Sequence, residues 1–254
     1  MEKNKPWEIK VDDTRELNNL YTFIIFCEDE VSEYIYFKWF ETSLIKINII
    51  NKQKSMMSNV VKAINYCQNN QFLIQEDGKY MIESEGIEVW CVYDRDLETD
   101  ANLIQEKNIE FNLSISTASD TGINVAWSND AFELWILLHF SEVDPLNILT
   151  TERKYYYDQL TEIFKNLPNP NIDLQKALVH ASFNYKKDLK QKNNFKDIVR
   201  PIILPRTNIA IQRAKALVEY HIQEQNHYDK KPCTLVYKLI ERIIEKGGKE
   251  IPIE

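Results

Sequence analysis

Two apolar runs of this 254-residue sequence end in carboxylates, where the burial of charge would be costly. The run at 21–27, YTFIIFC, is followed directly by Glu28, and the run at 89–93, VWCVY, by Asp94 and Asp96. Both runs have the composition of buried strands. Acidic residues in such places need a counter-charge, and carboxylate oxygens are ligands that Mg²⁺ or Mn²⁺ prefers.

The spacing of these acids predicts that they meet. Asp94 and Asp96 alternate along an extended chain, so they can point the same way while Arg95 points away. In a parallel sheet the carboxyl ends of all strands share one edge, where ligands bind. If the two strands are neighbours, Glu28 joins Asp94 and Asp96 there as a metal site. The alternative is that Asp94–Arg95–Asp96 is a simple turn.

A third acidic stretch is WSNDAFELWILLHF at 127–140. Asp130 and Glu133 have the D-x-x-E spacing of a helix capping box, which is a purely structural explanation of Glu133. The functional alternative places Glu133 at the same sheet edge, as a further metal ligand or the residue that orients a water. His139 lies in an apolar helical pattern and is expected to be a packing residue.

The elements that position these acids alternate between strand and helix up to residue 144. A face carrying Tyr34, Phe37, Phe40 and Leu44 predicts one helix, 58–67 a second, and the stretch after 98 a third. This alternation predicts an α/β domain with a mostly parallel sheet. The ranges read as strands are 21–27, 45–50, 89–93 and 123–127.

The pattern changes beyond residue 145, where helices dominate. Helices are expected at 151–167, 208–225 and 234–248, the last with Thr234 as N-cap and Gly247 as the terminating glycine. The sequence therefore predicts an α/β domain at 1–144 and a helical C-terminal region at 145–254 packed on it.

The charge is unevenly distributed. The net charge is −8, yet the segment 176–215 contains ten basic and two acidic residues and is therefore +8. Such a segment favours a surface for a polyanion, with a solvated helical face as the alternative. Aromatic residues Phe183, Tyr185 and Phe195 lie between its lysines and could stack on bases. The candidate phosphate contacts are Lys186, Lys187 and Lys238.

Several classes of protein are disfavoured. No apolar run is long enough to span a bilayer, and the N-terminus has no apolar signal region. The cysteines Cys27, Cys67, Cys91 and Cys233 form no C-x-x-C pair, which is typical of reduced thiols in the cytoplasm rather than of a zinc site. No phosphate-binding G-x-x-x-x-G-K-[ST] loop is present, so any ATP dependence would need a partner.

A glutamate after one strand and D-x-D after a later one resemble the Toprim pattern. Four stretches in this order resemble the RloB-like family more closely, which includes AbiL-type abortive-infection proteins. The similarity runs from about residue 20 to 245, and FELWILLHF is its most specific string. The four stretches are FCEDEVSEYIYFKWF, VWCVYDRD, WSNDAFELWILLHF and KPCTLVYKLIERI.

The resemblance implies a Toprim-like domain, related to that of OLD-type nucleases, with a helical C-terminal extension. It also implies a metal-dependent nuclease in anti-phage defence, usually encoded beside an ATPase partner. By position, Glu28 matches the Toprim glutamate, Asp94 and Asp96 the D-x-D, and Glu133 the acid of the F-E-L-W string. Asp130 replaces the usual proline of S-N-P.

Asp29 is a second departure, because a glycine usually follows the first glutamate. It could crowd the turn or add a ligand. A non-catalytic Toprim-like module that binds an ATPase or nucleic acid therefore stays as the alternative to a nuclease. DNA, RNA and transfer RNA are all open as substrates, and the sequence is compatible with a homo-oligomer.

Overall fold

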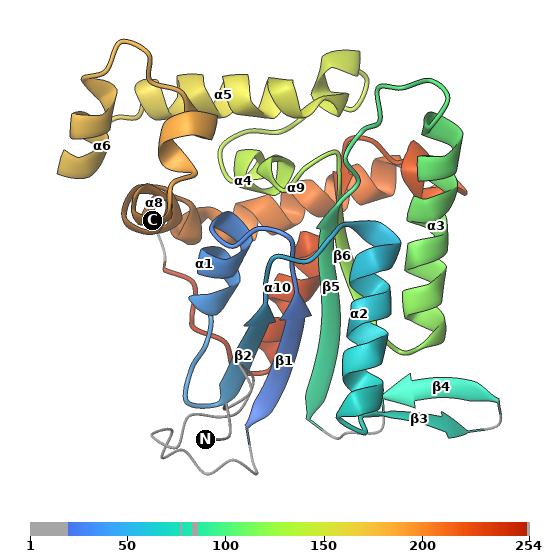
Figure 1. Ribbon diagram of the computed structural model, residues 1–254. Helices are drawn as coiled ribbons and strands as arrows, with labels where there is room; N and C mark the ends of the chain where they lie inside the picture. The colour runs from blue at the N-terminus through green and yellow to red at the C-terminus, as the bar shows by residue number, and fades with distance from the viewer. Residues whose placement is uncertain (1–19, 77, 83–85, 253–254) are drawn as a thin grey trace, which may run out of the picture.

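A five-stranded sheet lies at the centre of the protein, as Figure 1 shows. The computed structural model describes residues 20–252 except 77 and 83–85. The strand order is β2-β1-β5-β6-β7, with the first four parallel and β7 antiparallel to β6. The expected mainly parallel α/β fold is confirmed, and it is consistent with a Toprim-like domain. The strands are β1 (Tyr21–Phe26), β2 (Ile45–Ile50), β5 (Ile87–Asp94), β6 (Asn124–Asn129) and β7 (Cys233–Thr234).

The middle of β1 (23–26) and of β5 (89–93) is a continuous apolar run because both faces of the sheet are covered. Along β1, Phe23 and Ile25 pack into one hydrophobic core, and Ile24 and Phe26 into the other. This alternation follows from the two-residue period of an extended chain. The sheet is therefore the middle layer between two sets of helices.

Helices α2 (Met56–Asn69) and α3 (Ile104–Asp120) cover one face, and α1 (Ser32–Lys38) lies over the other, as Figure 1 shows. The predicted helix through Leu44 was too long. It ends at Lys38, and Leu44 is 63% exposed just before β2. The apolar spacing of 34–44 suggested one face, but the chain must turn there to begin the neighbouring strand.

The C-terminal region is mainly helical and packs into the same core as the sheet. Its longer helices extend the apolar layer on the α1 side, and short helical turns connect them. The longer helices are α5 (Arg153–Lys165), α6 (Ile172–Leu178), α9 (Thr207–Tyr220) and α10 (Val236–Glu245). The shorter ones include the π-helical turn η2 (Tyr185–Leu189) and α8 (Arg200–Ile203). The short helix α4 (Glu133–Leu138) precedes this region and follows β6.

The chain returns to the sheet as the short strand β7, immediately before the last helix, α10. Thr234 belongs to β7, which the sequence did not predict. The prediction of Thr234 as N-cap was wrong, because Leu235 is the N-cap of α10, although Thr234 Oγ1 accepts from Val236 N at 3.3 Å. Gly247 follows α10 at φ +104°, so the predicted glycine stop is confirmed.

A hairpin of β3 (Leu73–Glu76) and β4 (Lys79–Ile82) was also not predicted, because its strands are short and largely exposed.

The carboxyl ends of β1, β5 and β6 share one edge of the sheet, facing α5 (Figure 1). The four cysteines are free and buried, as expected. Among the described helices, none combines the length and the apolar character that crossing a membrane requires.

Candidate functional site

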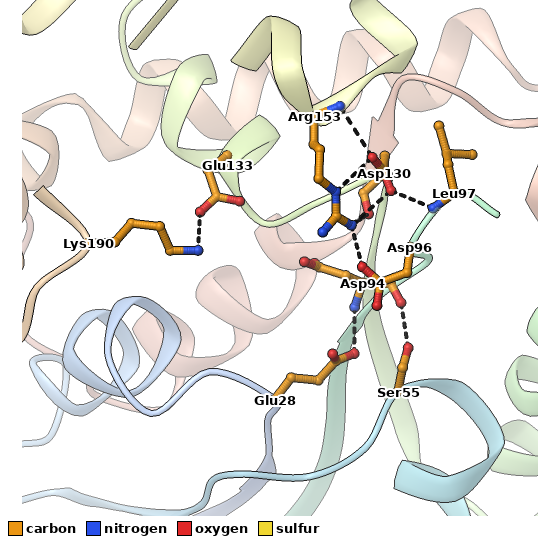
Figure 2. Close-up of polar contacts among 9 residues, drawn as sticks. All are labelled: Glu28, Ser55, Asp94, Asp96, Leu97, Asp130, Glu133, Arg153 and Lys190. Carbon is orange, nitrogen blue, oxygen red and sulfur yellow. Dashed lines mark hydrogen bonds and ion pairs between the residues drawn. The ribbon is translucent and has the colours of Figure 1, made fainter. Parts of the chain in front are cut away.

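Glu28 and Asp94 meet at the carboxyl edge of the sheet, as predicted. β1 and β5 are adjacent parallel strands, and Glu28 Oε1 accepts a hydrogen bond from the Asp94 backbone N–H at 2.9 Å (Figure 2). Ser55, just before α2, donates its hydroxyl to the Asp94 carbonyl at 2.7 Å. The backbone of Asp94 is therefore held from two sides. Its Oδ1 is buried and has no hydrogen-bond partner among the described residues.

Asp96 reaches the same edge, but it already has a cationic partner. Its Oδ1 forms an ion pair with Nη2 of Arg153, the first residue of α5 (Figure 2). Asp96 has a φ of +51°, which ends the extended geometry of β5. Its side chain is 48% exposed, so it lies at the rim of the site.

Asp130 anchors Arg153. The buried Asp130 carboxylate accepts from Arg153 Nε and Nη2, both at 3.0 Å, and from the Arg153 backbone N–H at 3.2 Å. It also accepts from Leu97 N at 2.8 Å. A two-pronged guanidinium–carboxylate contact is the strongest geometry for this pair. Asp130 thus joins β6, the D-x-D loop and α5.

Glu133 lies at the first position of α4 and is 2% exposed. Its Oε1 is 2.6 Å from Lys190 Nζ, as Figure 2 shows. The capping box between Asp130 and Glu133 was wrong, because α4 has no side-chain cap and Asp130 bonds Arg153 instead. Glu133 lies at the carboxyl edge of the sheet, where the functional alternative placed it, and its partner there is Lys190.

Side-chain-to-backbone hydrogen bonds link Asp29 and Glu33 in the turn that leads into α1, whose N-cap is Val31. Asp29 Oδ1 and Oδ2 accept from the backbone N–H groups of Val31 and Ser32 at 2.8 and 3.1 Å. The buried Glu33 in turn accepts from Asp29 N at 2.9 Å. Asp29 is therefore compatible with the strand-to-helix turn, because its side chain satisfies amide groups that the helix leaves free.

Arg95 points away from Asp94 and Asp96, the two acids of the D-x-D loop, as predicted. Its guanidinium contacts Asn108 on α3 and lies 5.9 Å from the centre of the Phe111 ring. The residue is 4% exposed. Arg95 therefore lies on the α3 side. The extended chain ends before Asp96, so the left-handed conformation of Asp96, and not strand alternation, sets the position of that acid.

Three carboxyl groups at the edge have raised pKa values. Burial, followed by repulsion from Asp96, raises the pKa of Glu28 to about 7. Burial and then the neighbouring Glu33 and Glu28 raise the pKa of Asp94 well above its ordinary range. Burial and then Glu28 do the same for Glu33. This negative charge is poorly compensated, as expected of a site that receives a cation.

Lys186 and Lys187 lie exposed on η2, the turn that leads to Lys190. Lys186 Nζ is 5.2 Å from the centre of the Tyr157 ring. Both lysines therefore belong to the segment that supplies a partner to Glu133. The aromatic residues between the lysines do not have the predicted role, since they are buried in the core and cannot stack on bases. These residues are Phe183, Tyr185 and Phe195.

Lys238 is exposed on α10 and lines a different cavity, of about 1010 Å³. That cavity also includes Tyr21 and Glu88, which lie at the start of β1 and β5. The structure therefore does not bring Lys238 to the carboxyl edge with Glu28 and Asp94.

Sequence reasoning missed Arg153 and Lys190 as site residues. Arg153 is one of several charged residues in its helix, and Lys190 one of ten basic residues in 176–215. Neither has a local signal, because the chain brings each to the sheet edge from a distant segment. For Asp130 there was a signal, namely an acid where the resemblance expects proline.

The fold and the site define an α/β protein with a carboxylate cluster at the carboxyl edge of a mainly parallel sheet. A sequence model described as RloB-like protein matches residues 23–243. The chain therefore belongs to the RloB-like protein family. No curated protein and no solved structure matches it.

The Toprim resemblance implies a divalent ion, and the residues present fit one in part. As the side chains lie, no group of three or more His, Cys, Asp or Glu among the described residues is arranged to hold a metal. Glu28 and Asp94 nevertheless offer hard oxygen donors at adjacent strand ends, and Asp94 Oδ1 is buried without a hydrogen-bond partner among those residues. Asp96 differs, because Arg153 holds it.

Proposed function

We propose that this protein is a divalent-metal-dependent nuclease that hydrolyses phosphodiester bonds as an effector of anti-phage defence. The observation that supports this most is the meeting of Glu28 and Asp94, with an unpartnered buried oxygen on Asp94. Membership of the RloB-like family and the basic segment 176–215 add support.

Glu28 and Asp94 would hold Mg²⁺ or Mn²⁺, and Asp96 would border that site. The ion would supply Lewis-acid stabilisation of the charge that develops on the phosphate. In the alternative role, with the ion held by Asp94, Glu28 would accept a proton from the attacking water, for which its pKa, raised by burial to about 7 in the metal-free protein, is suited near neutral pH. Glu133, held by Lys190, is a positioning residue in this proposal.

The proposed polymer partner is DNA or RNA, transfer RNA included, held by its phosphates. Lys186 and Lys187 are the proposed contacts close to the site, because they are exposed on the same turn as Lys190. Lys238 is a proposed contact at a separate cavity. A cytoplasmic location and an ATPase partner encoded in the same operon complete the proposal.

The test is cleavage of single- and double-stranded DNA and of transfer RNA with Mg²⁺ or Mn²⁺. Asp94→Asn should reduce the rate about 100-fold or more, since it removes a charged metal ligand without changing shape. Glu219→Gln is the matched control, an exposed acid on α9 that should leave the rate unchanged. Cleavage by Asp94→Asn at the wild-type rate would rule out the assignment.

A non-catalytic module that binds an ATPase or nucleic acid is the second candidate. One observation favours it: Arg153 and Lys190 already neutralise Asp96, Asp130 and Glu133 within the chain. This candidate predicts no cleavage and no metal binding by the wild-type protein, even when nucleic acid binds.

A further inference from the structure

Arg153 is fixed at the carboxyl edge rather than free at the surface. Three of its N–H groups, including the backbone amide, bond the Asp130 carboxylate at 3.0 to 3.2 Å. Asp130 is 2% exposed, and Leu97 N also holds it. An arginine bonded by two prongs to a buried carboxylate keeps its position, because moving it would leave that charge unpaired.

The outer side of Arg153 faces the D-x-D loop. Its Nη2 pairs with Asp96, and 37% of the Arg153 side chain remains exposed. The guanidinium therefore places a positive charge beside Asp96, the second acid of the loop (Figure 2).

The acids at this edge fall into two groups by their ion pairs. Arg153 pairs with Asp96 and Asp130, and Lys190 pairs with Glu133 and, at 3.9 Å, with Asp29. Glu28, Asp94 and Glu33 have no ion pair with another described residue. Glu28 Oε1 accepts from the Asp94 backbone N–H, and Glu33 accepts from the Asp29 backbone N–H. Of the acids that end the strands, those at the ends of β1 and β5 therefore lack a cation.

We propose that Arg153 is a resident cation of the site: the chain binds one divalent ion, at Glu28 and Asp94, and Arg153 takes the place of a second. This inference rests on the proposed nuclease function. Hydrolysis with two ions uses metals on both sides of the scissile phosphate. Here the Arg153 guanidinium, whose Nε and Nη2 bond Asp130, would contact a phosphate oxygen through Nη1 and supply the second positive charge.

The physical reason is local charge. A second divalent ion on Asp96 would lie beside a guanidinium that Asp130 prevents from leaving, and like charges at close range repel strongly in a partly buried site. Arg153 also needs no release on product departure, since it is part of the chain. Its role is to contact the substrate phosphate and to hold Asp96.

The test is calorimetric titration of Mn²⁺ and Mg²⁺ into the full chain. Wild type should bind one ion. Asp94→Asn should lose that ion, whereas Asp96→Asn should keep it with an affinity within about threefold of wild type. Loss of binding in Asp96→Asn to the same degree as in Asp94→Asn would overturn the proposal, and so would two ions in wild type.

A second variant set tests Arg153 directly. Arg153→Met combined with Asp130→Asn removes the guanidinium without leaving a buried charge, and it should raise the number of bound ions from one to two. Lys154→Met is the matched control, because Lys154 is the next residue on α5, 79% exposed and paired with Asp158. It should still bind one ion. One ion in the double variant, with thermal unfolding that shows a folded protein, would contradict the inference.

These outcomes separate the two proposals. No ion in wild type would overturn both the nuclease proposal and this inference. Two ions in wild type would overturn only the resident cation and leave the nuclease proposal standing. Once cleavage is seen, Arg153→Lys should recover part of the rate lost in Arg153→Met, because it restores the charge but not the fork.

Discussion

Lys190 Nζ lies 2.6 Å from Glu133 Oε1, which joins the C-terminal basic segment to the start of α4 at the carboxyl edge of the sheet. Glu133 is almost fully buried, whereas the Lys190 side chain is 27% exposed. The two partners should therefore respond differently to substitution.

Lys190→Met should lower the free energy of unfolding by about 3 kcal/mol, because it leaves a buried carboxylate unpaired. Glu133→Gln should cost less, since Lys190 can reach solvent. The double variant should be more stable than the sum of the single changes predicts, by about 1 to 3 kcal/mol in urea unfolding. Lys187→Met, an exposed neighbour on η2, is the control. Additive effects would show that the pair has no coupling.

Glu28 should make the metal-free protein less stable as pH rises. Burial and Asp96 raise its pKa from 4.5 to about 7, so folding favours the protonated form. The stabilisation is complete below pH 4.5 and is lost as pH rises through 7, a change of up to about 3 kcal/mol. Urea unfolding of Glu28→Gln at several pH values should show a smaller loss of stability with rising pH, with the remainder due to Asp94 and Glu33, whose pKa values are also raised. An unchanged pH profile in the variant would contradict the assignment.

His139 should have the opposite effect at acid pH. It is buried between Tyr36 and Trp135, and its Nδ1 lies 2.8 Å from the Trp135 carbonyl oxygen. Burial, more than any other cause, lowers its pKa from 6.5 to about 3. The stabilisation is therefore complete above pH 6.5 and is lost as pH falls towards 3, by up to about 5 kcal/mol.

The comparison for His139 is the pH profile of thermal unfolding in His139→Gln, which should be flatter between pH 6.5 and 4. His180→Gln is the control, since His180 is exposed. Equal flattening in both variants would show that His139 is not the group responsible.

We expect Asp29 to stabilise the turn that leads into α1, through its hydrogen bonds to backbone N–H groups, and not to bind a metal ion. Asp29→Ala removes the acceptor for Val31 and Ser32 N–H and should cost about 1 kcal/mol of stability. Asp29→Asn keeps an acceptor and should cost only a few tenths. Mn²⁺ titration of both variants should give the wild-type stoichiometry. Loss of ion binding in Asp29→Asn would instead make Asp29 a ligand.

The four predicted strands are confirmed because each is indicated by the composition of its own short segment. β2 begins and ends at Ile45 and Ile50 as expected, and β1, β5 and β6 contain or closely overlap the predicted apolar runs. A strand covered on both faces carries a nearly continuous run of β-branched and aromatic residues, and that composition is visible in the sequence. β7 was missed because two residues carry no periodicity, and pairing with β6 alone makes them a strand.

The strand pattern in the sequence was sufficient to predict that Glu28 and Asp94 lie at the carboxyl edge of one sheet, because parallel strands end on the same side of their sheet. It could not determine which acids there would be neutralised. Arg153 and Lys190 come from segments that only tertiary packing brings to that edge, and ion pairs depend on distance in space rather than along the chain. Which acids have cationic partners therefore depends on tertiary packing: Asp96, Asp130 and Glu133 have them, and Glu28 and Asp94 have none among the described residues.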